Sequence, residues 1–160
     1  MTAPQTNELL VRLAKQSDVS AATNVLRRSI TDLCHQDHVG DPETLDRWLA
    51  NKTFEQVHQW INADSLMVYV AEIDSAIAGI GALSTKGVVL LNYVDPGRRF
   101  QGVSSALLAT MEADAANAGL ALVRLESTKT AEQFYRARGY DLDPTNGAPD
   151  HLCMSKRLEK

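Results

Sequence analysis

The sequence predicts an α/β domain of the α+β type, in which helices flank a mixed, mostly antiparallel sheet. Short apolar runs typical of strands alternate with longer segments whose apolar residues recur at helical spacing. The chain has 160 residues, of which 44% are hydrophobic and 22% charged, as in ordinary soluble globular proteins. We therefore expect a single domain over residues 1–160, with a flexible segment at residues 1–7.

The first half of the chain is expected to form a strand, three helices and a hairpin. Apolar runs predict three strands, at residues 9–13, 67–72 and 77–82. The last two strands are joined by a tight turn at Asp74-Ser75. Residues that commonly begin helices stand at three places: Ser17-Asp18, Asp41-Pro42 and the capping box that starts at Thr53.

The second half continues with strands and helices in alternation. Apolar runs predict strands at residues 88–94 and 120–125, and final strands near Tyr140 and over residues 151–158. One helix begins after Gly102, and a second follows Thr128, which can cap it, and ends near Gly139.

The loop between the strand 88–94 and the next helix is the most informative segment. Pro96 stops the strand because it has no amide hydrogen, and Gly97 allows a turn. The helix that follows Gly102 leaves its first amides unpaired at the positive end of its dipole. Arg98 and Arg99 add positive charge. The segment therefore predicts a binding site for a phosphate or pyrophosphate.

Two common phosphate loops do not fit this segment, and a plain strand-loop-helix corner is the remaining alternative to a phosphate site. A P-loop needs a lysine after its second glycine, whereas Gly102 is followed by Val103-Ser104. The dinucleotide fingerprint needs three glycines, and only Gly97 and Gly102 are present.

The run Arg99-Phe100-Gln101-Gly102-Val103-Ser104 resembles the acetyl-CoA loop of the Gcn5-related N-acetyltransferase (GNAT) superfamily. That loop reads Gln/Arg-x-x-Gly-x-Gly/Ala after a strand ending in Val-x-Pro, and Ser104 replaces the last small residue. The segment from Ala131 to Tyr140 is similar to a second motif of the family, Ala-x-x-Phe-Tyr-x-x-x-Gly-Phe. The resemblance extends to the order of elements along nearly the whole chain, and it implies a GNAT-like sheet of six to seven strands.

The resemblance implies direct transfer of an acetyl group from acetyl-CoA to a primary amine of a small molecule or peptide, without a metal. It makes Tyr135 the acid that protonates the departing thiolate, since a phenol with a pKa of about 10 can donate to a thiolate of similar basicity. It also implies the following cofactor-binding residues: Asn92, Val94, Arg99, Phe100, Gln101, Gly102, Val103, Ser104, Ser105 and Thr128. Many members of the family carry asparagine in place of Thr128.

The base that deprotonates the amine is not identified by the sequence. Several relatives use a glutamate early in the strand, where this chain has Val88. The remaining candidates are His35, His38, Glu126, His151 and water. A solvated polar loop is the simpler interpretation of the segment that holds His35 and His38, and two histidines alone make a weak metal site.

The acceptor amine is not identified either. Trp48 and Trp60 stand on predicted short helices, where they either line an acceptor pocket or belong to the core. Acidic residues nearby would attract a cationic amine or simply be solvated: Asp32, Asp37 and Asp41.

Composition excludes several other classes of function. The formal charge of −4, from 16 basic and 20 acidic residues, argues against a nucleic-acid partner. The two cysteines have no metal or redox spacing, and no apolar run has membrane length, so we expect a cytoplasmic protein without a membrane partner. A homodimer is common in the family. The alternative to an enzyme is a regulatory module that binds acyl-CoA and acts through a protein partner without turnover.

Overall fold

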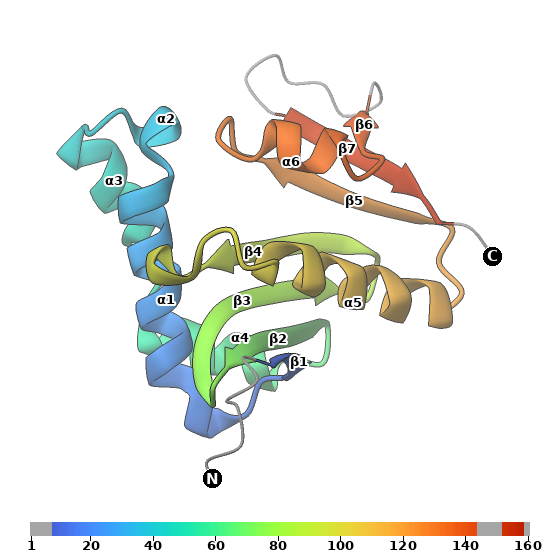
Figure 1. The fold of residues 1–160 in the computed structure, drawn as a ribbon, viewed down its shortest axis with the longest axis horizontal. Helices are drawn as coiled ribbons and strands as arrows, with labels where there is room; N and C mark the ends of the chain where they lie inside the picture. Colours follow the sequence, from blue (N-terminus) through green and yellow to red (C-terminus); the bar gives the residue numbers. More distant parts are fainter. Residues whose placement is uncertain (1–7, 144–151, 159–160) are drawn as a thin grey trace, which may run out of the picture.

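The computed structural model describes residues 8–143 and 152–158, and it places seven strands from these residues in one sheet (Figure 1). The strands are β1 (Leu9–Leu13), β2 (Leu66–Ile73), β3 (Ala76–Ser84), β4 (Val88–Val94), β5 (Leu122–Ser127), β6 (Asp141–Leu142) and β7 (Leu152–Arg157). Their order is β1-β2-β3-β4-β5-β7-β6, and only β4 and β5 run parallel. The predicted mixed, mostly antiparallel sheet is therefore confirmed.

Helices cover both faces of this sheet. They are α1 (Val19–Leu33), α2 (His35–His38), α3 (Pro42–Leu49), α4 (Phe54–Asn62), α5 (Val103–Asn117) and α6 (Glu132–Arg136), with short 3₁₀ turns η1 (Gln16–Asp18) and η2 (Pro96–Arg98). One core forms between the sheet and α1 with α4, and a second forms beneath α5 and α6. Within the described ranges, no helix is both long and apolar enough to cross a membrane.

Several predicted boundaries are confirmed by the contacts that form them. The Asp41 carboxylate accepts from the Thr44 amide at 3.4 Å, and Thr53 Oγ1 accepts from the Gln56 amide at 3.1 Å. Asp74 and Ser75 have φ values of 52° and 65°, as a tight hairpin turn requires.

Two boundaries in the second half differ from the prediction. Strand β5 begins at Leu122 rather than Leu120, because the chain is still leaving α5 through Gly119. Thr128 Oγ1 accepts from the Ala131 amide at 3.2 Å, so it caps a turn, and α6 starts only at Glu132.

Helix α5 lies unusually close to strand β3. A Cβ atom on Gly79 would lie 2.5 Å from Val103 Cγ1 and 2.9 Å from the carbonyl oxygen of Tyr93. Only glycine allows this approach, which holds the first turn of α5 against the end of β4.

The sheet opens between its two parallel strands. β4 and β5 pair only at Val88 with Arg124 and at Val89 with Leu125. Directly afterwards Leu90 forms a bulge, because Leu91 pairs with Ala82 while Val89 pairs with Leu83. Figure 1 shows β5 and β7 splayed away from β4 beyond this point. The strands therefore diverge toward their carboxyl ends.

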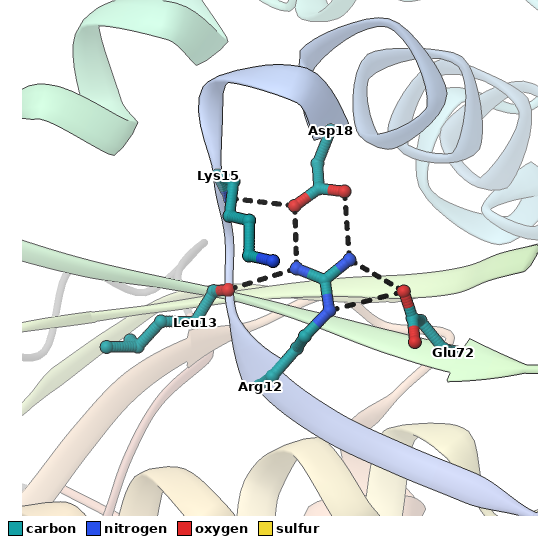
Figure 2. A network of polar contacts seen from close by, with 5 residues as sticks. All are labelled: Arg12, Leu13, Lys15, Asp18 and Glu72. Atoms are coloured by element: carbon teal, nitrogen blue, oxygen red, sulfur yellow. Dashed lines mark hydrogen bonds and ion pairs between the residues drawn. The ribbon is translucent and has the colours of Figure 1, made fainter. Parts of the chain in front are cut away.

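An arginine ties the beginning of the chain to the sheet (Figure 2). Arg12 in β1 donates to both Asp18 oxygens, at 2.7 and 2.9 Å, and to Glu72 Oε1 in β2 at 2.6 Å. The Lys15 amide donates to Asp18 Oδ2 at 2.7 Å. Asp18 was expected only to begin a helix, but its carboxylate instead forms a two-pronged ion pair.

The Asp18 ion pair should make part of the stability depend on pH. The hydrogen bonds from Arg12 hold the pKa of Asp18 below its ordinary value of 3.8. Its contribution is therefore fully present above pH 3.8 and is lost as the pH falls through the lower, folded-state pKa. We expect Asp18→Asn to lower the free energy of unfolding by about 2 kcal/mol at pH 7, measured by urea denaturation.

Asp64 is exposed and has no side-chain hydrogen bond or ion pair with any described residue, so Asp64→Asn is the matched control. The difference in the free energy of unfolding between wild type and Asp18→Asn should be smaller at pH 3 than at pH 7. A difference that stays constant from pH 7 to pH 3 would contradict the role given to this ion pair.

Candidate active site

Two adjoining cavities occupy the gap between β4 and β5. The large cavity has a volume of about 750 Å³ and lies among α3, α4 and the two strands. The small cavity, of about 40 Å³, lies among β4, β5 and α6. Both are lined by the same six residues: Val89, Leu90, Leu91, Tyr93, Glu126 and Thr128. The diverging strands thus leave two adjoining cavities with a shared lining, and we call this pair of cavities the passage.

Tyr135 lies in the wall of the small cavity and is only 6% exposed. Its ring packs edge-on against Phe134 and Tyr140, with centroids 5.1 and 5.7 Å away. Burial raises the pKa of Tyr135 to about 12, an effect that the neighbouring Asn92 amide opposes. The phenol therefore keeps its proton at neutral pH and is able to donate it.

Asn92 also lines the small cavity, and it has an unused hydrogen-bond acceptor. Its Nδ2 donates to the Ser104 carbonyl at 3.3 Å, which links β4 to the first turn of α5. Its Oδ1 is buried and has no partner among the described residues. A buried amide oxygen without a partner costs free energy, so Asn92 offers a position for a donor on a bound molecule.

The predicted phosphate loop has the local geometry that the sequence indicates. Gly102 has φ +83°, and no atom lies within 4 Å of the position that its Cβ would occupy. The first intrahelical bond runs from Ala106 N to Gly102 O at 3.0 Å, so the amides before Ala106 are the unpaired ones. Asp95 anchors the loop by accepting from Gly97 N at 2.9 Å and from Arg28 at 2.5 Å.

Arg138 brings positive charge to this helix start, a position that its sequence neighbours do not reveal. Its guanidinium donates to Ser105 Oγ at 2.6 Å and to the Phe134 carbonyl at 2.9 Å. It also lies over the Phe134 ring, 3.7 Å from the centroid. Arg136, two residues earlier, instead pairs with Glu132 on its own helix at 3.1 Å. The two arginines are only two residues apart in the sequence, yet the structure gives them different partners.

The other predicted cofactor residues lie at or near the small cavity or the loop. Thr128 lines both cavities, and Val94 pairs with Gly79 at the end of β4. Phe100 and Gln101 are exposed, and Phe100 stacks under the Arg99 guanidinium at 4.7 Å. These positions leave the loop open to solvent on its outer side.

The candidate bases differ in burial and in their contacts. His38 is 1% exposed, lies 3.1 Å from the Ile30 carbonyl through Nε2, and accepts from Gly40 N through Nδ1 at 3.2 Å. With both ring nitrogens bonded, His38 stabilises the end of α1, and the predicted solvated loop is wrong at this residue. The His35 side chain and all of His151 lie outside the described residues. Glu126 lines both cavities.

Asp37 holds the two halves of the chain together across the passage. Its carboxylate accepts from Lys129 N and from Thr130 Oγ1, both at 2.7 Å. It therefore anchors the loop between β5 and α6. Trp48 and Trp60 both pack against the core, and both also line the large cavity.

Tyr93 lies at the candidate site although no motif in the sequence singles it out. It lines both cavities, and burial raises its pKa, with Cys34, Tyr135 and Asp37 adding to the shift. The sequence feature that could have identified Tyr93 is its position in β4, one residue after Asn92. Across the described ranges, no group of three or more His, Cys, Asp or Glu side chains is arranged to hold a metal ion.

Solved structures with the same fold are N-acetyltransferases. A PaiA N-acetyltransferase from Thermoplasma acidophilum, in complex with coenzyme A, is 20% identical, with a TM-score of 0.80 over 94% of this chain and 99% of that one. A Gcn5-related N-acetyltransferase from Rhodopseudomonas palustris is 19% identical, with a TM-score of 0.79 over 93% and 95%. The ribosomal-protein-S18-alanine N-acetyltransferase from Escherichia coli is 15% identical, with a TM-score of 0.66 over 96% of each chain.

No curated protein sequence shows a significant match to this chain. The model of the acetyltransferase (GNAT) domain, in contrast, matches residues 30–155, which include the loop at Gly102, the Phe134-Tyr135 helix and both cavities. Since this match covers most of the chain, the protein belongs to the GNAT acetyltransferase family.

Proposed function

We propose that this protein transfers the acetyl group of acetyl-CoA directly to a primary amine of a small molecule or peptide. The observation that carries the proposal is the pair of adjoining cavities between β4 and β5, which share six lining residues and have Tyr135 in the wall of the small one. The small cavity lies beside α6, which shares a core with α5, and the large cavity is lined by residues of α3 and α4, which belong to the other core. A donor and an acceptor can therefore meet from opposite sides of the sheet.

The residues present fit coenzyme A on the side of the small cavity. The amides at the start of α5 and the guanidinium of Arg138 favour the pyrophosphate. The unpaired Asn92 Oδ1 suits an amide hydrogen of the pantetheine arm. We assign Val94, Arg99, Gly102, Val103, Ser104, Ser105 and Thr128 to the same cofactor site, with Phe100 and Gln101 at its outer edge.

Direct transfer requires positioning and proton movement rather than a nucleophilic side chain. The amine nitrogen bonds to the acetyl carbon as the carbon–sulfur bond breaks, and the amine releases one proton to solvent. Tyr135 gives its proton to the thiolate and recovers one from solvent. Burial keeps the Tyr135 phenol protonated until it is needed.

The proposal is tested by acetyl-CoA calorimetry together with thiol release across a panel of amines. We expect binding of acetyl-CoA and turnover with at least one class of amine. An absence of acetyl-CoA binding would overturn the proposal. Tight binding without turnover on any amine would instead favour a regulatory module that binds acyl-CoA.

Tyr135→Phe should lower kcat by about 100-fold with little change in acetyl-CoA affinity, because the variant keeps the ring packing and loses only the acid. Because the pKa of Tyr135 is about 12, its ionisation should not reduce the wild-type rate between pH 7 and pH 10. Tyr93→Phe is the matched comparison, since Tyr93 is the other phenol in the lining of the small cavity. Slow transfer in Tyr93→Phe alone would move the acid role to Tyr93.

Arg138→Met should weaken acetyl-CoA binding by about tenfold, because it removes a charge beside the start of α5. Arg136→Met is the control, since the ion-pair partner of Arg136 in the described part of the chain is Glu132 on its own helix. Calorimetry at low and high salt measures the effect, and thermal unfolding checks that both variants fold. Equal losses of affinity in the two variants would show that Arg138 has no specific place in the site.

A further inference from the structure

Lys52 is a partly buried cation in the wall of the large cavity. Its Nζ donates to the neutral Asn51 Oδ1 at 2.5 Å, and no carboxylate among the described residues pairs with it. Burial lowers the pKa of Lys52, which reflects the cost of removing an ammonium group from water. Such a charge is normally compensated by an anion, so the cavity wall favours an anionic group on whatever it binds.

The backbone that carries Lys52 is fixed. Arg27 in α1 reaches across to donate to the carbonyls of Leu49 and Lys52, both at 3.0 Å, and the Lys52 amide donates to the Leu49 carbonyl at 3.0 Å. These partly buried contacts end α3 and set the turn into α4. The Lys52 side chain therefore extends from a backbone that is held in place, as a binding group should be.

The other charges that face the large cavity do not neutralise Lys52. Both oxygens of Asp37 accept from the loop between β5 and α6. Glu126 makes an interaction of its own. Lys129 adds a second cation to the lining, without a carboxylate partner among residues 8–143 and 152–158. Among the described residues, the lining thus carries two lysines that form no ion pair, beside acidic groups that already make contacts of their own.

Apolar surface lies beside Lys52. Trp48 precedes it on α3 and Trp60 follows it on α4, and both line the large cavity. The edge of the His38 ring lies against Trp48, with centroids 6.4 Å apart. Flat indole surfaces suit a planar or apolar side chain. The volume of about 750 Å³ is in the range of small-molecule sites.

We propose that the acceptor is a free amino acid with an aromatic or apolar side chain, whose carboxylate binds Lys52 and whose side chain packs against Trp48 and Trp60. This inference rests on the proposed function and names the substrate class of the same site. The α-amino group then points along the passage toward Tyr93 and Tyr135. A polyamine would place a second cation near Lys52, and an internal peptide amine would leave Lys52 without its anion.

Matched pairs of amines test this class. The wild-type protein is assayed by thiol release with tryptophan against tryptamine and with phenylalanine against phenethylamine, alongside spermidine and a short peptide. We expect kcat/KM to be at least about tenfold higher for the member of each pair that has the carboxylate. The tryptophan-to-tryptamine ratio should fall toward one in Lys52→Met, through KM, and recover in part in Lys52→Arg.

Lys86→Met is the matched control, because Lys86 is exposed in the turn between β3 and β4 and does not line either cavity. Lys86→Met should keep the wild-type ratio of kcat/KM for tryptophan to kcat/KM for tryptamine. Equal or better turnover of tryptamine or spermidine by the wild type would overturn the amino-acid class. If Lys52→Met lost kcat/KM equally for both members of a pair, that result would also overturn the amino-acid class.

Calorimetry separates this inference from the proposed function. Tryptophan and tryptamine are titrated into the wild-type protein saturated with coenzyme A. Preferential binding of tryptophan supports the amino-acid class even if no amine turns over, and no preference overturns it. Failure to bind acetyl-CoA, in contrast, would overturn the proposed function itself.

Discussion

The site depends on one constraint in the sheet, the short parallel pairing of β4 with β5. Only two residue pairs join these strands, and the bulge at Leu90 follows immediately. Because the two strands then diverge, the backbone opens where a continuous sheet would have closed it. Both cavities, the shared wall at Tyr93 and the position of Tyr135 follow from this divergence. Across the gap between the strands, Asp37 anchors the loop between β5 and α6.

The passage has different chemistry at its two ends. On the side of α5, close packing at Gly79 brings the helix start against β4, and Asn92 joins the two elements through the Ser104 carbonyl. This side supplies amides, an arginine and a protonated phenol. On the side of α3 and α4, indole rings and Lys52 form the wall. For the direct transfer proposed above, this difference suits two unlike substrates that approach each other at the residues shared by both cavities.

Local sequence signals predicted the elements and the strand-loop-helix segment at Gly102 well. Pro96, Gly97 and Gly102 act through their own backbone preferences, so the end of β4 and the start of α5 were predictable without tertiary contacts. The caps at Asp41 and Thr53 are equally local. His38 was misjudged because its role depends on Ile30 and Gly40. Its polarity predicted a solvated loop, whereas packing against Trp48 buries it.

By itself, the sequence determined the family, the strand-loop-helix segment at Gly102 and the placing of Phe134-Tyr135 on a later helix, since these depend on residues close together in the chain. The tertiary structure alone decided which charges meet. Arg138 rather than Arg136 reaches the start of α5. Lys52 forms no ion pair with another described residue, whereas Asp37 accepts hydrogen bonds from the loop between β5 and α6. Such pairings join residues tens of positions apart, and they are set by how helices pack on a sheet that has opened between two strands.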